Sequence, residues 1–375
     1  MIDLYSMSVI VFFAFLGILI YRDRKNLEIK YILVMKRTKR FRDIIDKIAK
    51  KSPLFWKIVG TIAIVICLFY MIQGVYILFT TQPTVQFVLP TPSAIGSSGP
   101  GYILIPFWFW IITIFSILVP HELFHGIMAR AEKIKLKSVG LLLLAIFPGA
   151  FVEPDEKEVK KAKVLSKLRI FSMGSFANFL VSFLIFYLTL YLIWPLSVSP
   201  GIKLLNVTEG APADLAGLKP GMMLTEINGK KIVPTYTEYL NGSSYLHDEL
   251  GNAKPNDNVM VKSDGDTYNV KLGFNEKTNS TYMGITYAPL FRINPEFFLG
   301  VLIPLLTMIS LFSLAVGIVN ILPIYPLDGG LIIQAITDRY AKKRSKQIVR
   351  IITYLVLIIL IYSFFKPFFI EFLNL

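Results

Sequence analysis

The stretch VPHELFHG, residues 119–126, decides the fold because it places ionisable side chains at the end of a long apolar run. The preceding residues 102–119, YILIPFWFWIITIFSILV, carry no charged side chain. Their length and polarity predict a transmembrane helix. Ionisable side chains within such a helix are costly unless they have a function and a partner, so their position predicts a functional site inside the membrane.

Two histidines in this stretch have the spacing of metal ligands. His121 and His125 stand four positions apart, so both imidazoles project from one face of a helix and can share an ion. Glu122 would lie beside that ion, where its carboxylate can take a proton from bound water. The chain has only three histidines, and two of them are here. The alternative is a helix end whose polar side chains face lipid headgroups.

The composition is that of a polytopic membrane protein, since 54% of the 375 residues are hydrophobic and 14% are aromatic. The formal charge of +14 does not indicate nucleic-acid binding, because the basic residues gather between apolar runs and set membrane orientation. The single cysteine, Cys67, lies in an apolar run, which excludes a disulfide within the chain. The N-terminal apolar run has no basic flank or cleavage site before it, and is predicted to be a retained span.

Six apolar runs are predicted to span the membrane: residues 4–21, 54–79, 102–119 with the motif that follows, 170–194, 297–319 and 351–365. The basic segments alternate with segments that are poor in Lys and Arg; the basic ones are 22–51, 130–169 and 339–350, and the poor ones are 80–101 and 195–295. This bias predicts a multi-pass protein of the cell membrane with its N-terminus and residues 195–295 outside. The histidines then lie toward the cytosolic side.

The first basic segment contains apolar residues at the spacing of one helix face, namely Phe41, Ile44, Ile45 and Ile48. The pattern predicts an amphipathic helix on an anionic inner leaflet, with a solvated linker as the alternative. Residues 80–101 are rich in Pro, Gly, Ser and Thr and are predicted to form a loop.

Residues 139–152, VGLLLLAIFPGAFV, are apolar but too short to cross a bilayer, and Pro148-Gly149 interrupt them. They predict a β-hairpin that dips into the membrane, since such backbone is tolerated only against protein or a wet cavity. A buried core loop is the alternative. An extended substrate segment would pair with the hairpin, and the residues predicted to contact it are Phe147, Pro148, Gly149 and Phe151.

A catalytic zinc usually takes three protein ligands and a water molecule, so a third ligand is expected. The candidates are Asp328, Glu153 and His247. His247 lies in the outside domain and fits an ordinary exposed helix. Asp328 is favoured because two prolines break the helix before it and two glycines after it allow a close backbone approach. A cap at the membrane edge is the alternative for Asp328.

Asn178 is the candidate for an oxyanion donor, because a neutral amide stabilises a tetrahedral oxyanion without competing for zinc. Gly174 lies four residues earlier on the same predicted helix face and would let a neighbouring helix pack closely. Helix packing alone is the alternative explanation for both residues.

The segments HELFH (121–125), SMGSFANF (172–179) and NILPIYPLDGG (320–330) together resemble the site-2 protease family of intramembrane zinc metalloproteases. The segment AIFPGAFV (145–152) resembles the membrane re-entrant β-hairpin of that family. The resemblance implies one Zn²⁺ per chain, bound by His121, His125 and Asp328. It also implies that Glu122 is the general base and that Asn178 assists the oxyanion. Ser175 departs from the family pattern, in which many members have proline after the glycine.

Residues 209–232, EGAPADLAGLKPGMMLTEINGKKI, resemble a bacterial-type PDZ domain. The resemblance implies a short helix over Ala213–Leu218 and a strand over Met223–Ile227 before a turn at Asn228-Gly229. The carboxylate-binding loop would then contain Met283, Gly284 and Ile285. Backbone amides there would hold a peptide C-terminus by strand addition, and a purely steric role is the equal alternative.

The predicted fold is a polytopic α-helical membrane protein with a membrane re-entrant β-hairpin and a small α+β PDZ-like domain. The predicted domains are two N-terminal helices with a basic cytosolic connector (1–101), a catalytic core in two parts (102–194 and 296–335), the PDZ-like domain (195–295), and a basic loop with the last helix (336–375).

The predicted function is an intramembrane zinc endopeptidase whose substrates are transmembrane proteins in the lipid bilayer, cut directly or after a first extracytoplasmic cut. No nucleic-acid partner is expected. One alternative is a membrane adaptor with a structural metal, which the intact Glu122 argues against. Another is a metalloprotease for soluble substrates at the cytosolic face, which the membrane depth of His121 argues against.

Overall fold

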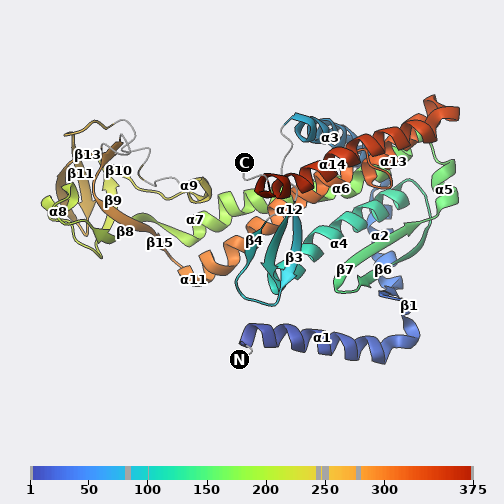
Figure 1. Ribbon diagram of the computed structural model, residues 1–375, viewed down its shortest axis with the longest axis horizontal. Coiled ribbons are helices and arrows are strands. Elements are labelled where there is room, and N and C mark those ends of the chain that lie inside the picture. Colours follow the sequence, from blue (N-terminus) through green and yellow to red (C-terminus); the bar gives the residue numbers. More distant parts are fainter. Residues whose placement is uncertain are drawn as a thin grey trace. The chain divides into compact units, whose positions relative to one another are not determined.

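The computed structural model describes residues 3–80, 86–99, 101–241, 246, 253–275 and 280–372. It divides into two compact units, of which the first combines Met1–Phe183 with Thr307–Leu375 and the second is Leu184–Leu306 (Figure 1). Within the described residues, six helices are long and apolar enough to cross a membrane by length and composition. This fold class is the polytopic helical membrane protein that the sequence predicts.

Helices make up most of the first unit. They are α1 (Leu4–Asp23), α2 (Lys39–Lys51), α3 (Pro53–Thr80), α4 (Phe107–Ala131), α5 (Glu156–Lys161), α6 (Val164–Leu188), α12 (Ile303–Ile321), α13 (Asp328–Tyr340) and α14 (Ser345–Phe372). Their shared core contains fully buried side chains from α3, α4 and α6, among them Ala63, Met128 and Met173. The motif helix α4 therefore lies in the best-packed part of the unit.

The predicted start of the motif helix is wrong by five residues. Tyr102–Pro106 forms strand β5, and the helix begins at Phe107. Pro106 accounts for the difference, because a proline disfavours helical backbone at the residue before it. The predicted loop before this helix is also partly wrong, since β3 (Phe87–Thr91) and β4 (Ser97–Gly99) flank β5 in a small sheet.

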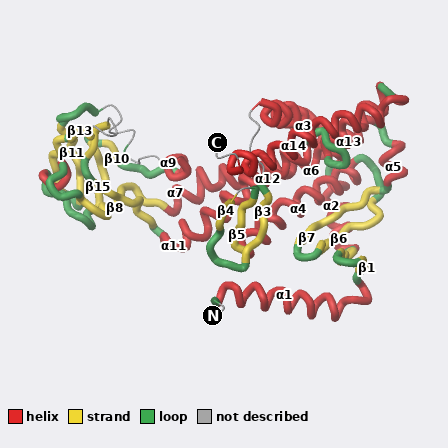
Figure 2. The backbone as a smooth tube through the Cα atoms, viewed as in Figure 1, coloured by secondary structure: helices red, strands yellow, loops and turns green. Residues whose placement is uncertain are grey.

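The predicted hairpin is present as β6 (Leu136–Leu144) and β7 (Phe147–Pro154), shown beside α4 in Figures 1 and 2. Pro148-Gly149 lies inside β7 and does not interrupt it; Pro148 pairs with Leu143 across the hairpin. This placement is compatible with strand structure because β7 ends the order of the sheet, and edge strands tolerate proline.

The basic connector contributes two strands that the sequence did not predict. β1 (Glu28–Lys30) and β2 (Leu33–Arg37) extend the hairpin into an antiparallel sheet of order β1-β2-β6-β7. Leu33 pairs with Leu144 and Arg37 with Gly140, so β2 covers residues 140–144 of the outer edge of β6. The edge of β7 has no strand neighbour along its whole length among the described residues.

The predicted amphipathic helix is present as α2, but protein covers part of its apolar face. Ile45 and Ala49 are buried, whereas Ile44 remains 49% exposed. The guanidinium of Arg130 on α4 donates to both carboxylate oxygens of Asp46, at 2.5 and 3.3 Å. The helix is confirmed and is attached to α4, and its contact with an anionic leaflet stays a prediction.

The second unit is built around a six-stranded sheet of order β12-β11-β9-β8-β15, with β10 paired to β9. The strands are β8 (Val198–Val207), β9 (Met223–Ile227), β10 (Lys230–Lys231), β11 (Asn258–Ser263), β12 (Asp266–Lys271) and β15 (Ile285–Phe291), and a separate pair is β13 (Gly273–Asn275) with β14 (Ser280–Tyr282). The short helices are α7 (Trp194–Ser197), α8 (Pro212–Leu215), α9 (Tyr236–Asn241) and α11 (Pro295–Phe297). The small α+β domain expected from the sequence is thus present.

Candidate metal centre

Three potential metal ligands converge in the first unit. His121 and His125 lie one turn apart on α4, with their Nε2 atoms 3.2 Å from each other. Asp328, the first residue of α13, faces both: its Oδ1 lies 3.2 Å from Nε2 of His125, and its Oδ2 lies 3.6 Å from Nε2 of His121. His121 and Asp328 are each only 8% exposed. The helix break before α13 therefore brings a residue 203 positions later in the chain against the motif.

The approach of Asp328 depends on the two glycines that follow it. A Cβ on Gly329 would collide with the carbonyl oxygens of Ile321 and Leu322, where α12 ends. A Cβ on Gly330 would collide with the backbone of Ile324 and Tyr325. The first turn of α13 thus lies directly on the backbone of the broken segment, the close approach that the Gly-Gly pair predicts.

Helix α6 supplies an outer partner for each of the three residues. The Nδ1 of His125 lies 2.7 Å from the carbonyl oxygen of Ile170. The hydroxyl of Ser175 donates to Oδ2 of Asp328 at 3.0 Å, and the amide of Asn178 lies 3.1 Å from Nδ1 of His121. Such contacts fix the orientation of metal ligands and raise their basicity.

Gly174 on α6 leaves the space in which the two imidazoles meet. A Cβ at this position would collide with Nε2 of His125 and would lie 2.7 Å from Nε2 of His121. The residue therefore allows α6 to approach α4 closely, and it does so directly opposite the ligand atoms. The sequence predicted close helix packing at Gly174. The structure shows that this packing leaves room for the Nε2 atoms of His121 and His125.

The donor set fits a tetrahedral zinc ion. Zinc bonds to nitrogen are about 2.0–2.1 Å long, so two ligands of a tetrahedral ion lie roughly 3.3 Å apart. The two Nε2 atoms are 3.2 Å apart, that of His121 lies 3.6 Å from Oδ2 of Asp328, and that of His125 lies 3.2 Å from Oδ1. With one ligand atom taken from each residue, the three atoms lie within 4.8 Å of one another. Two imidazoles and one carboxylate are also a ligand set that zinc takes in hydrolases.

The hydrogen bonds of the imidazoles fit the same ion. When Nδ1–H of His125 donates to the Ile170 carbonyl, its Nε2 keeps a free lone pair for a metal. The same condition for His121 requires an acceptor opposite Nδ1. Oδ1 of Asn178 is buried without a hydrogen-bond partner among the described residues. Rotating this amide by half a turn lets Oδ1 accept from Nδ1–H, which satisfies both groups.

The side chain of Glu122 reaches the hairpin. Its Oε2 accepts a hydrogen bond from the backbone N–H of Val152 on β7, at 3.0 Å. It borders a small apolar pocket of about 80 Å³ between α4, the hairpin and α2, together with Val119, Leu141 and Phe151. The carboxylate thus lies next to the metal ligands in sequence and beside the free edge of β7 in space.

The other hairpin residues predicted to contact substrate are spread along β7. Phe151 borders the Glu122 pocket, and Phe147 packs edge-on against Trp110 with ring centroids 5.4 Å apart. Pro148 borders a different cavity, next to α1. A Cβ on Gly149 would press on the side chain of Leu142. The structure therefore places these four residues on one strand, and only Phe151 lies near Glu122.

The predicted carboxylate-binding loop belongs to the second unit. The side chain of Met283 is buried in the core of that unit, and Gly284 has a φ of +79°. The carbonyl of Met283 accepts a hydrogen bond from the N–H of Ala213 in α8 at 2.9 Å, and the carbonyl of Gly284 accepts one from the N–H of Thr208, before α8, at 2.8 Å. Ile285 begins β15, which ends the order of its sheet. These two hydrogen bonds thus fix the loop beside an edge of the sheet.

The other two ligand candidates do not join the group. Glu153 accepts a hydrogen bond from the hydroxyl of Ser138 at 2.6 Å and remains at the base of the hairpin. His247 lies outside the described residues. The sequence did not predict Ser175 as a partner of Asp328, although a hydroxyl between Gly174 and Asn178 on a membrane helix was a usable signal.

Residues 109–363, more than half of the chain, match the sequence pattern of peptidase family M50. The chain belongs to peptidase family M50. This M50 peptidase is 27% identical over 365 residues to an uncharacterised protein of Methanocaldococcus jannaschii, covering 92% of this chain and 90% of that protein. It is 28% identical over 143 residues to a membrane-bound transcription factor site-2 protease homolog of Arabidopsis thaliana, covering 37% of this chain and 26% of that protein.

Two solved structures resemble part of this M50 peptidase. The PDZ domain of an SdrC-like protein from Listeria monocytogenes is 24% identical, with a TM-score of 0.19, and covers 24% of this chain and 87% of that domain. The corresponding domain from Listeria innocua is 27% identical, with a TM-score of 0.18, and covers 23% of this chain and 92% of that domain.

Family membership confirms the predicted enzyme class: the protein is a membrane metalloprotease, a hydrolase of peptide bonds.

Proposed function

We propose that this M50 peptidase is a zinc endopeptidase that cuts transmembrane segments of other membrane proteins within the bilayer. One observation supports this above all. Two histidines and an aspartate, each with its own partner on α6, meet inside a bundle of helices long enough to cross a membrane. A hydrolytic site at that place would act on peptide bonds that water-exposed proteases do not reach.

His121, His125 and Asp328 would hold the zinc ion, which supplies Lewis-acid polarisation of the scissile carbonyl and an acidified water molecule. Glu122 takes the proton from that water and passes it to the leaving amine. With its amide turned as argued above, Asn178 accepts from His121 through Oδ1 and directs its N–H₂ toward the oxyanion. Each of these side chains thus has a defined role as a ligand, a proton carrier or a hydrogen-bonding group.

The substrate would have to be extended where it is cut, because a helical backbone hides its carbonyl groups. Strand addition can hold it in that form. Since β2 pairs with residues 140–144 of β6 and Glu122 contacts β7, the substrate would add to the edge of β7, beside Glu122. A substrate carbonyl that takes the N–H of Val152 would release the Glu122 carboxylate for the water molecule.

We also propose how the protein is oriented in the membrane and which class of substrate it cuts. The Lys and Arg bias supports a cell-membrane protein with its N-terminus and the PDZ-like residues 195–295 outside, and with the metal centre toward the cytosol. Residues 102–194 and 296–335 would form the catalytic core. The edge of β15 would offer a place for a peptide C-terminus, which fits membrane substrates already shortened by a first cut.

Replacing the general base tests the proposal. Glu122→Gln should keep zinc, measured by metal analysis of the purified full-length protein, and should cut a synthetic transmembrane span in liposomes at no detectable rate. Glu156→Gln is the matched control, because Glu156 is an exposed residue of α5 far from the metal group in sequence and pairs only with Lys160 among the described residues.

Wild-type cutting by Glu122→Gln would refute the role of the glutamate. If the wild type cut an unfolded soluble protein as readily as the span, the intramembrane substrate class would be wrong.

A further inference from the structure

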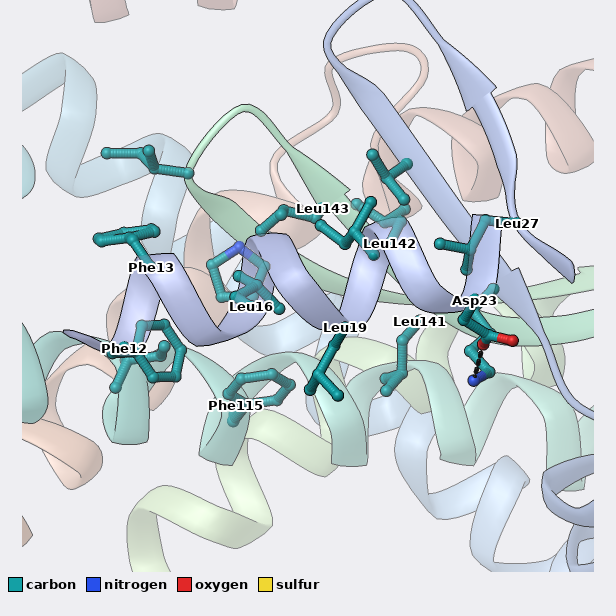
Figure 3. Close-up of a pocket in the computed structure, with 16 residues that line it drawn as sticks. Phe12, Phe13, Leu16, Leu19, Asp23, Leu27, Phe115, Leu141, Leu142 and Leu143 are labelled. Carbon is teal, nitrogen blue, oxygen red and sulfur yellow. Dashed lines mark hydrogen bonds and ion pairs between the residues drawn. The ribbon is translucent and has the colours of Figure 1, made fainter. Parts of the chain in front are cut away.

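A second cavity lies next to α1, near the tip of the hairpin. It has a volume of about 350 Å³ and is bordered by α1, β2, β6 and α4 (Figure 3). Its walls are almost entirely apolar, with Phe12, Leu16 and Leu19 contributed by α1. At one end, Lys36 donates to the carboxylate of Asp23, and this pair neutralises its own charge.

Helix α1 covers this cavity while it is fastened mainly at its ends. Near its start, the backbone N–H and the indole N–H of Trp108 donate to Tyr5 and Ser8, at 3.1 and 3.0 Å. Near its end, Asp23 pairs with Lys36 of β2. Between these points Phe12 and Phe13 pack against Phe107, and Val9 is the one buried residue of the helix.

The cavity continues toward the Glu122 pocket. Leu141 of β6 borders both spaces. One stripe of α4 also runs through both, because Ile111 and Phe115 border the cavity while Val119 and Glu122 border the pocket. These four positions are separated by four, four and three residues, so they lie along one helix face. The two spaces are thus successive parts of one groove between α4 and the hairpin.

The spacing along the groove can be expressed in substrate residues. At a rise of about 1.5 Å per residue, Phe115 and Ile111 lie roughly 10 and 16 Å from Glu122 along α4. An extended chain advances about 3.3 Å per residue, so these distances correspond to about three and five substrate residues. Strand β7 runs over the same length, since Phe147 packs on Trp110 and Val152 bonds to Glu122.

We propose that this cavity is the substrate subsite for apolar side chains about three to five residues from the scissile bond, on the side toward Phe107. The inference rests on the proposed function and adds a specificity determinant to it. Helix α1, which precedes the residues matched by the family pattern, would then be a wall of the subsite. The self-neutralised Asp23–Lys36 pair favours an uncharged side chain over a charged lipid headgroup as the occupant.

The test uses synthetic spans that differ at one position. Spans with Leu or Ala at each of positions three to five from the cut are compared in liposomes with the full-length protein. The wild type should cut Leu spans about tenfold faster or more, as expected when a side chain of that size fills an apolar pocket. Leu16→Trp, which fills the cavity, should remove the preference at these positions, so that Leu and Ala spans are cut at similar rates.

Ile112→Trp is the matched control. Ile112 lies next to Ile111 on α4, is 43% exposed and borders neither the cavity nor the Glu122 pocket. It should keep the preference for Leu. If Leu16→Trp slows all spans equally, or if Ile112→Trp removes the preference as well, the subsite is not there.

Cross-linking gives a second measurement that does not depend on turnover. Cys67 is the only cysteine and is buried, so a Leu16→Cys change in the Glu122→Gln protein adds one accessible thiol. With copper phenanthroline and air as the oxidant of the two thiols, a span with one cysteine four residues from the cut should form a disulfide with it, and a span with the cysteine on the opposite side of the cut should not.

The two proposals fail differently in these experiments. A wild type that cuts no span contradicts the proposed function. A wild type that cuts spans without positional preference and without this cross-link contradicts the subsite alone, and would leave a lipid chain as the occupant of the cavity.

Discussion

The two sides of α4 are packed in opposite ways. On the side toward α6, His121 and His125 are fixed by hydrogen bonds, and the facing residues Ser172–Phe179 are all buried. On the side toward the hairpin, the stripe from Ile111 to Glu122 borders about 350 and 80 Å³ of apolar space. A metal has one geometry and benefits from rigid ligands, whereas a site for variable peptide segments needs room.

This contrast predicts that changes on the α6 side affect metal binding and that changes on the hairpin side affect which substrates are cut. The two effects are separable because zinc content and cleavage are measured independently. The following predictions test that separation.

The largest effect is expected for Gly174→Ala. The added Cβ would collide with Nε2 of both histidines, and the buried α6 has no space to shift. The protein should lose its zinc, measured by metal analysis, and all cleavage should stop. Gly17→Ala is the control, because a Cβ there meets nothing within 4 Å. A Gly174→Ala protein with full zinc content would contradict the close approach of α6.

Asn178→Asp separates the two roles of the asparagine. The carboxylate still accepts from Nδ1–H of His121 but offers no N–H to an oxyanion, so zinc should be retained. Cleavage should fall about 10²–10³-fold, the cost of one oxyanion donor. Asn178→Leu should lower zinc affinity as well. Wild-type cleavage by the Asn178→Asp protein would show that Asn178 acts only through His121, and equal zinc loss in both variants would contradict its role as the acceptor for His121.

Much of the metal centre could be predicted from the sequence because its signals are local. The spacing of His121 and His125 defines a helix face, and a break followed by two glycines marks the approach of Asp328. The hairpin could be predicted as well, since its apolar run is too short for a membrane span.

The sequence could not predict features that depend on a distant partner. The strand β2, LVMKR, lies in a basic segment and exists because it pairs with β6, about a hundred residues later. Strand preference depends on such neighbours more than on the residues themselves. The contact of Ser175 with Asp328 and the cavity under α1 likewise arise only when separate helices pack.

Ser175→Ala should have a smaller effect on the α6 side. Asp328 would lose one hydrogen bond but keep its position on α13, so zinc affinity should fall about 10–100-fold, the usual cost of an outer partner. Ser172→Ala is the control one turn earlier on α6, because the Ser172 hydroxyl is buried without a hydrogen-bond partner among the described residues. Equal zinc affinities in a chelator competition would show that Ser175 does not orient Asp328.

The smallest effect on the chemistry is expected for Asp46→Asn, on the hairpin side of the comparison. It removes the charge that pairs with Arg130 and so loosens α2 where Ile45 packs near Gly126. A hydrogen bond between charged groups contributes about 1.5–3 kcal/mol, so the midpoint of thermal unfolding should fall. Zinc content should not change, because among the described residues the hydrogen bonds and ion pairs of His121, His125 and Asp328 involve one another and α6, not α2. A loss of zinc at unchanged thermal stability would mean that α2 and the metal centre are coupled. That result would contradict the separation of the two sides of α4.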